Sequence, residues 1–184
     1  MKIYLIGDSH SQVLFPNLVK KLEADGHSIV GVESRAGWSA QRFIDSNVKS
    51  RLKDANPDLT IFSLGGNNRD LDLQSYRNTV RTLRSGIGNS IWLGPFPSTV
   101  RSVDDRHRWT DDALNKILSS SKYISLMGTS ISGLSSDGVH FTPTSYRKII
   151  NDNYDQISQK MRSNFLLPIL AIGLGAYLYS LSKR

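Results

Sequence analysis

The sequence contains no cysteine. This absence excludes disulfide bonds, zinc sites built on thiolates and a cysteine nucleophile, but it assigns no compartment, since proteins of every compartment can lack cysteine. Prolines are also few, 6 against 14 glycines, and no low-complexity tract interrupts the chain. With 39% hydrophobic and 21% charged residues, the 184-residue chain has the composition of a folded protein with one core.

The sequence also lacks the patterns that bind nucleic acids, metals or phosphates. The net charge of +7 favours anionic partners, but the lysines and arginines are scattered, without a dense basic run or interleaved aromatics. No nucleic-acid partner is therefore expected. Histidine, aspartate and glutamate show no metal-ligand spacing, and there is no glycine-rich phosphate loop, so neither a metal nor a cofactor is expected.

Short apolar runs alternate with helical apolar spacing along most of the chain. The first run is too short for a signal-peptide core of about 7 to 15 residues and is typical of a strand. Five strands are predicted at Lys2 to Gly7, Ser28 to Val32, Leu59 to Leu64, Ser90 to Leu93 and Tyr123 to Met127. Helices are predicted at Val13 to Lys21, Ala40 to Lys53, Leu73 to Leu83, Thr110 to Leu118 and Pro143 to Met161.

This alternation predicts an α/β fold. Because the strands are apolar throughout, they should form a five-stranded parallel sheet with helices on both faces, a three-layer α/β/α sandwich of the flavodoxin-like type. Such sheets bind ligands outside the carboxyl ends of their strands. The loops at residues 7–11, 34–39, 65–69 and 94–99 should therefore share one rim.

The first rim loop carries a serine, Ser9, directly before a predicted helix. A hydroxyl there lies near backbone N–H groups and the positive end of the helix dipole, which would stabilise an oxyanion formed on a substrate. Serine is also a common helix cap, so Gly-Asp-Ser alone does not separate a nucleophile from a cap.

A serine nucleophile needs a base and a group that orients the base. Asp137 and His140 lie on one glycine-containing loop before the last predicted helix, where both side chains can turn toward the rim. An Asp-Gly turn followed by a surface histidine would have the same sequence. Gly37 and Asn67, after the second and third strands, could donate to an oxyanion, although both residue types are also common in turns.

Taken in order, these four motifs resemble the SGNH (GDSL-like) hydrolase family: Gly-Asp-Ser, an isolated glycine, Gly-x-Asn and Asp-x-x-His. The resemblance covers about residues 2 to 160. It implies that Ser9 is the nucleophile, that His140 is the base and that Asp137 orients it. It also implies an oxyanion hole made of the backbone N–H groups of Ser9 and Gly37 and the side-chain amide of Asn67.

Two positions depart from the family pattern. His10 stands where leucine is usual, which places a second imidazole beside the nucleophile, although His140 remains the expected base. Asn68 stands where aspartate is more usual, which changes the support of that loop but retains the donor Asn67. In the same comparison Asp8 would brace the nucleophile loop rather than act as a second acid.

The other histidines have no nucleophile partner in the sequence. His27 follows an Asp-Gly turn and His107 lies in a polar stretch between two arginines, so both are predicted to be exposed. The three tryptophans are expected either in the core or on a sugar-binding rim, and Trp38, beside Gly37, is the first to test.

Residues 165–181 form an uncharged, mostly apolar stretch of roughly 17 residues, near the minimum that crosses a bilayer. A helix that is apolar on every side must be buried in protein or lipid, and basic flanks with tyrosines near one end are typical of membrane anchors. We therefore expect a hydrolase domain over residues 1–162 and a single-pass anchor over residues 163–184, spanning from Phe165 to Leu181. The alternative is a buried or oligomer-forming helix.

The flanking charges do not decide which side of the membrane the domain occupies. A tail-anchored protein that faces the compartment of its synthesis is expected, and a viral membrane would also suit so compact a chain.

The expected activity is hydrolysis of an acyl ester through an acyl-enzyme. A short acyl group such as acetyl, on a carbohydrate or cell-wall polymer, is favoured because the chain is short and shows no lid insertion. A membrane lipid is the second choice because of the expected anchor. The alternative from another class is a catalytically silent, membrane-anchored binding or assembly protein on the same scaffold.

Overall fold

A computed structural model describes the backbone of residues 1–68 and 72–181 and the side chains of residues 1–68 and 72–164. Its strands pair in parallel and in the order β2-β1-β3-β4-β5. The predicted five-stranded parallel sheet is thus confirmed. The strands are β1 (Lys2–Gly7), β2 (Ser28–Ser34), β3 (Leu59–Ser63), β4 (Asn89–Leu93) and β5 (Tyr123–Ile124).

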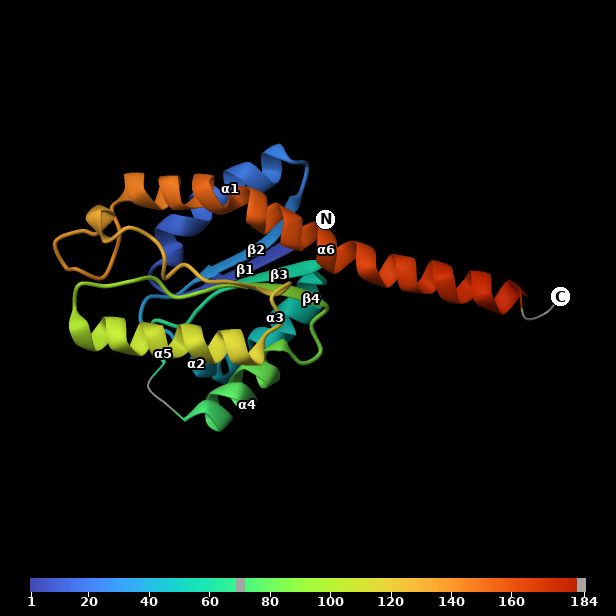
Figure 1. The fold of residues 1–184 in the computed structure, drawn as a ribbon, viewed down its shortest axis with the longest axis horizontal. Helices are drawn as coiled ribbons and strands as arrows, with labels where there is room; N and C mark the ends of the chain where they lie inside the picture. Colours follow the sequence, from blue (N-terminus) through green and yellow to red (C-terminus); the bar gives the residue numbers. More distant parts are fainter. Residues whose placement is uncertain (69–71, 182–184) are drawn as a thin grey trace.

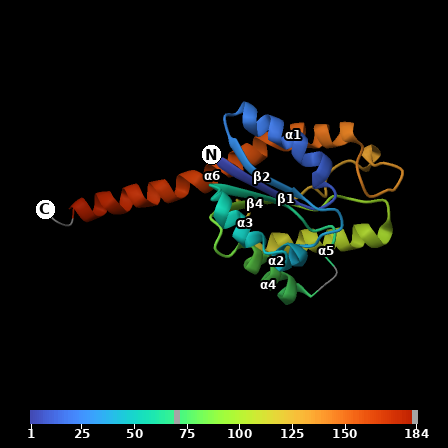
Figure 2. The same ribbon diagram turned by 180° about the vertical axis from the view of Figure 1, so that it is seen from behind.

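Helices cover both faces of the sheet, which confirms the three-layer α/β/α sandwich (Figure 1). One face carries α1 (Ser11–Ala24) and α6 (Pro143–Leu181), as the view from behind also shows (Figure 2). The other face carries α2 (Ala40–Asp45), α3 (Val48–Ala55), α4 (Leu73–Arg84) and α5 (Arg101–Ile117). A short 3₁₀ helix, η1 (Ile131–Gly133), lies in the long connection from β5 to α6.

The alternation of side chains along the strands explains the two layers. In β1, Ile3 and Leu5 pack with the α1 and α6 side chains, whereas Tyr4 and Ile6 pack with the opposite layer. Since both faces are covered, apolar residues suit every position. Strand β2 lies on one side of β1 and strand β3 on the other, so the strand order reverses at β1, and ligands of such sheets bind where this reversal occurs.

Two helices start or break at places that the sequence pattern did not indicate. The helix predicted from Ala40 to Lys53 is divided into two, because Asn47 adopts a left-handed conformation with φ of 59°. Helix α5 begins at Arg101, well before the predicted start at Thr110. Strand β5 is also shorter than predicted and ends at Ile124.

Helix α6 continues past the predicted end at Met161 to Leu181, and its C-terminal half projects beyond the three-layer body (Figures 1 and 2). The side chains of the predicted anchor, residues 165–181, lie outside the described part of the structure. Within the part that is described, no helix is long and apolar enough to cross a membrane. The anchor therefore stays a prediction.

Candidate active site

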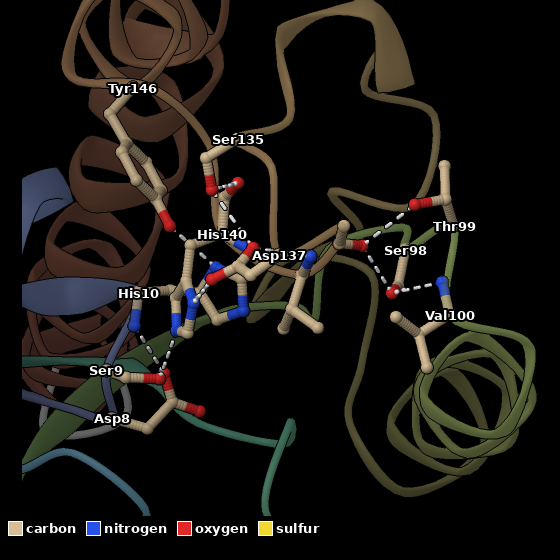
Figure 3. A network of polar contacts seen from close by, with 12 residues as sticks. Asp8, Ser9, His10, Ser98, Thr99, Val100, Ser135, Asp137, His140 and Tyr146 are labelled. Atoms are coloured by element: carbon tan, nitrogen blue, oxygen red, sulfur yellow. Dashed lines mark hydrogen bonds and ion pairs between the residues drawn. The ribbon is translucent and has the colours of Figure 1, made fainter.

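The loop after β1 brings Ser9 to the rim of the sheet. Gly7 is required there, because a Cβ at this position would collide with the Ser11 side chain and the Ser63 carbonyl. The N-cap residue of α1 is His10, which makes no side-chain cap, and the Ser9 hydroxyl contacts His140 instead (Figure 3). Ser9 is thus not a helix cap through its side chain.

Three side chains from two distant parts of the chain meet at this rim (Figure 3). Ser9 Oγ lies 2.9 Å from His140 Nε2, and His140 Nδ1 lies 2.7 Å from Asp137 Oδ2. Because a carboxylate only accepts, Nδ1 carries a hydrogen and donates it to Asp137. In the neutral ring, Nε2 then accepts from the Ser9 hydroxyl. This is the arrangement of a serine nucleophile with an oriented base.

The loop from Ser135 to His140 holds Asp137 in place. Asp137 Oδ1 accepts from the backbone N–H groups of Val139 and His140, both at 2.8 Å, and from the Ser135 hydroxyl at 3.0 Å. The bond to the His140 ring, together with these N–H groups, holds the pKa of Asp137 below its usual range. The same loop therefore contains both the Asp-Gly turn and the hydrogen-bonded pair of Asp137 and His140.

Ser98 and Thr99, in the rim loop after β4, support the same turn from outside. The Gly138 carbonyl oxygen accepts from Ser98 Oγ at 2.7 Å and from the Thr99 hydroxyl at 3.3 Å (Figure 3). It also accepts from the Thr99 N–H at 2.9 Å. Gly138 has φ of 67°, and a Cβ there would collide with the Thr99 hydroxyl. Sequence reasoning missed this support, because no local spacing links residues 98 and 138.

The Asp8 carboxyl braces the nucleophile loop from beneath. It is 3% exposed, and its Oδ1 accepts from the His10 N–H at 3.1 Å. The backbone N–H of Gly66 also donates to this carboxyl, which ties the loops after β1 and β3 together. Burial raises the pKa of Asp8 to about 7.

His10 is buried beside this carboxyl and does not bind Ser9. Its Nδ1 lies 2.7 Å from the Tyr146 hydroxyl, and its ring stacks on Phe96 with centroids 4.6 Å apart. Burial, together with the neighbouring His140 and His107, lowers the pKa of His10 to about 3. The imidazole that contacts the candidate nucleophile is therefore that of His140.

The prediction that His107 is exposed is wrong, because the side chain is 2% exposed. The early start of α5 places it on the inner face of that helix, with Thr110 and Leu114. His107 Nδ1 lies 2.6 Å from the Phe96 carbonyl oxygen, and the ring also contacts the backbone of Gly66. It therefore holds two rim loops together.

The other residues singled out from the sequence are not among those that line the cavity at Ser9 and His140. His27 is partly exposed at the turn before β2. Trp92 belongs to the core, and Trp109 packs against Tyr76. Trp38 is partly buried and packs against Phe43.

The candidate oxyanion donors are placed around two adjoining cavities. Ser9 and Asn67 line one of about 180 Å³ together with His140, and Gly37 and Asn67 line the other, of about 290 Å³. One N–H of the Asn67 amide donates to the Trp38 carbonyl at 3.4 Å, which leaves the second for a ligand. Within the described residues, the backbone N–H groups of Ser9 and Gly37 make no hydrogen bond.

The second cavity is lined by two buried polar side chains that lie near each other. Asn68 is 5% exposed and Tyr76 is 3% exposed, and the Asn68 side chain acts on the Tyr76 hydroxyl closely enough to lower its pKa, although burial raises that pKa more. Neither Asn68 Nδ2 nor the Tyr76 hydroxyl makes a hydrogen bond of good geometry in the described part of the chain. A larger cavity of about 430 Å³ lies elsewhere, beside α6 and the connection that precedes it, and none of the predicted site residues lines it.

Comparison with models of protein families found no match, and neither did a search of curated proteins. Among solved structures, the chain is similar to a lipase/acylhydrolase from Enterococcus faecalis, with 17% identity, a TM-score of 0.66 and coverage of 84% of this chain and 96% of that chain. It is also similar to a Clostridium thermocellum family 3 carbohydrate esterase, with 19% identity, a TM-score of 0.66 and coverage of 89% and 98%.

A third similar structure is the catalytic domain of Streptococcus pneumoniae peptidoglycan O-acetyltransferase A, with 12% identity, a TM-score of 0.64 and coverage of 89% of this chain and 93% of that chain. At such identities the likeness shows the fold. The fold is that of the SGNH hydrolases, as the sequence motifs predicted.

Proposed function

We propose that this protein is a serine carboxylic ester hydrolase with Ser9 as its nucleophile. The observation that carries the proposal is the pair of hydrogen bonds, 2.9 and 2.7 Å long, that joins Ser9 through the His140 ring to Asp137. The similarity in fold to an acylhydrolase and a carbohydrate esterase supports the same chemistry.

In the first half of the proposed reaction, Ser9 Oγ attacks the ester carbonyl carbon while His140 Nε2 takes the hydroxyl proton. The carbonyl electron pair moves to oxygen, and the N–H groups of Ser9, Gly37 and Asn67 would stabilise this oxyanion. Asp137 keeps Nδ1 protonated and stabilises the imidazolium. When the intermediate collapses, the alcohol leaves with the proton from Nε2, and the acyl group stays on Ser9.

In the second half, water attacks the acyl-enzyme. His140 Nε2 takes a proton from that water, a second oxyanion forms in the same place, and its collapse breaks the bond to Ser9 Oγ. Ser9 Oγ then regains its hydrogen from Nε2 and the carboxylic acid departs. Neither half requires a group beyond the chain, the ester and water.

The proposed substrate carries a short acyl group, such as an O-acetyl group on a carbohydrate or cell-wall polymer. The cavity at Ser9 and His140 has about 180 Å³ and adjoins one of about 290 Å³. Mostly polar side chains line both, and such a lining suits a short acyl group on a polar alcohol better than a long acyl chain. Two of the structurally similar proteins are a carbohydrate esterase and a peptidoglycan O-acetyltransferase.

Replacing the nucleophile tests the proposal. We expect Ser9→Ala and His140→Ala each to reduce kcat/KM for 4-nitrophenyl acetate to background, while thermal unfolding shows that both variants remain folded. A panel of acetyl, butyryl and longer esters should show the highest kcat/KM for acetyl. Background rates for the wild type on every ester would overturn the proposal and favour a binding or assembly protein.

The proposal extends to location: residues 163–184 anchor the hydrolase domain of residues 1–162 in a membrane, with Phe165 to Leu181 as the span. The support is the uncharged apolar sequence with basic flanks and the projection of α6 beyond the body (Figure 1). After alkaline carbonate extraction, the full chain should remain with the membranes. Its release into the soluble fraction would contradict the anchor.

A further inference from the structure

Among the described residues that line the cavity beside Ser9 and His140, Arg106 is the one lysine or arginine. It lies on α5 one residue before the buried His107 and is itself partly buried. None of the lining residues that the structure describes is acidic. In this part of the chain, the lining therefore brings a cation next to the candidate nucleophile.

The guanidinium of Arg106 has no partner among the residues that the structure describes. Its Nε is shielded from solvent and has no hydrogen-bond acceptor within the described residues, nor does Arg106 form an ion pair there. Two other arginines of α5 differ, since Arg101 pairs with Asp105 and Arg108 with Asp104. A shielded N–H without an acceptor has lost its hydrogen bond to water without forming another, which costs free energy on folding.

The other N–H groups of Arg106 also form no hydrogen bond or ion pair with the described residues, and an anion in the cavity would give this guanidinium an acceptor. The guanidinium presents a planar set of donors that matches two oxygens of a carboxylate or phosphate, whereas a neutral hydroxyl would leave its charge uncompensated. The net charge of +7 also attracts anionic molecules to the protein. With about 180 Å³, the cavity has room for such a group on a short linker.

Building on the proposed function, we infer that the natural ester carries an anionic oxygen group, a carboxylate or a phosphate, close to the scissile bond, and that Arg106 binds this group. Arg106 would thus determine specificity rather than take part in bond making. It would favour acidic esters over neutral esters of the same size.

Matched pairs of esters test this inference with the full chain. Mono-4-nitrophenyl succinate against 4-nitrophenyl butyrate places a carboxylate on the acyl part. 3-Acetoxybenzoate and 3-acetoxyphenyl phosphate, each against phenyl acetate, place a carboxylate or a phosphate on the alcohol part. These arms separate the two sources of the anion and the two parts of the ester.

We expect Arg106→Gln to lower kcat/KM for at least one anionic ester about 10- to 100-fold more than for its neutral analogue, as expected for lost hydrogen bonds to a charged group. Arg106→Lys, which keeps the charge, should recover part of the loss. Arg101→Gln is the matched control, because Arg101 is exposed on the same helix. Equal losses on the neutral and anionic members of all three pairs would overturn the inference.

A binding measurement separates this inference from the proposed function. Benzoate and phenyl phosphate are titrated calorimetrically into Ser9→Ala and into Ser9→Ala/Arg106→Gln. If no ester is hydrolysed but anion binding requires Arg106, the proposed function fails and the anion site stands. If neutral esters are hydrolysed but no anion binds and none is preferred, the proposed function stands and the anion site fails.

Discussion

The candidate site has two halves that are built in different ways: the serine half, residues 8–10 after β1, and the base half, the loop from Ser135 to His140. The serine half lies at the end of a buried strand, where Asp8 and His10 are 3% and 4% exposed. The base half lies on a surface loop, where the Asp137 and His140 side chains are 49% and 39% exposed. Packing positions the first, and a local network of hydrogen bonds positions the second (Figure 3).

Because of this difference, we expect substitutions in the two halves to affect different properties, stability in the serine half and activity in the base half. Changes beneath Ser9 should alter the free energy of unfolding and its pH dependence, because they affect buried groups. Changes in the Ser135 to His140 loop should alter turnover with little effect on unfolding, since exposed ion pairs contribute roughly 0 to 1 kcal/mol to stability.

The largest effect is expected on the exposed half. Asp137→Asn removes the acceptor that fixes the His140 tautomer, so kcat for 4-nitrophenyl acetate should fall about 10³- to 10⁴-fold. The urea unfolding free energy should stay within about 1 kcal/mol of the wild type. Asp54→Asn, at an exposed carboxylate on α3, is the matched control. An Asp137→Asn variant with undiminished kcat would refute the orienting role.

The buried half should be visible in the pH dependence of stability. The pKa of Asp8 is raised from 3.8 to about 7, so its stabilising contribution is complete below pH 3.8 and is lost as the pH rises toward 7. The pKa of His10 is lowered from 6.5 to about 3, so its contribution is complete above pH 6.5 and is lost as the pH falls toward 3. Between about pH 4 and 6.5 the two slopes oppose each other, each at most ~1.4 kcal/mol per pH unit.

Replacing Asp8 or His10 singly should reveal how much each residue contributes to the pH dependence of the unfolding free energy. In Asp8→Asn the unfolding free energy should rise more steeply with pH in this window than in the wild type, and in His10→Gln it should rise less or fall. Urea titrations between pH 4 and 7 measure both variants against the wild type. If the unfolding free energies of the wild type and both variants change with pH in parallel, burial does not keep Asp8 and His10 neutral.

A smaller effect is expected where the two halves are joined. Ser98→Ala removes the hydroxyl that donates to the Gly138 carbonyl and accepts from the Val100 N–H. We expect kcat to fall about 3- to 10-fold and the unfolding free energy to fall by about 1 kcal/mol. Ser102→Ala, at an exposed position on α5, is the control. An unchanged kcat would mean that the loop holds Asp137 and His140 without Ser98.

The smallest effect should have the opposite sign. Tyr76→Phe deletes a buried hydroxyl that lies near the Asn68 side chain but makes no hydrogen bond of good geometry in the described part of the chain, so the protein should gain up to about 1 kcal/mol of stability. Tyr154→Phe is the contrast, because that hydroxyl donates to Asp25 at 2.8 Å. Destabilisation by Tyr76→Phe in urea titrations would show that the hydroxyl is satisfied in solution.

Sequence reasoning succeeded where the signal is local. Uniformly apolar runs predicted the sheet, and the loops that follow them placed Ser9 and Asn67 at one rim. Asp137 and His140 share one short loop, so their contact needed only the turn at Gly138.

Features that depend on tertiary structure could not be predicted. Val100, the N-cap residue of α5, makes no side-chain cap, so no capping residue in the sequence indicates that the helix starts this early. The burial of His107 and the position of Arg106 on the helix therefore could not be predicted. Asparagine tolerates the left-handed conformation that divides α2 from α3 at Asn47, but it does not require it.

The most direct test of the central claim is to locate the adduct that a fluorophosphonate forms with the full chain, by mass spectrometry of its peptides. If His140 activates Ser9, one adduct per chain should form on Ser9, and its rate of formation should drop at least about 100-fold in His140→Ala. An adduct on another residue, or none in protein that still hydrolyses esters, would contradict the claim.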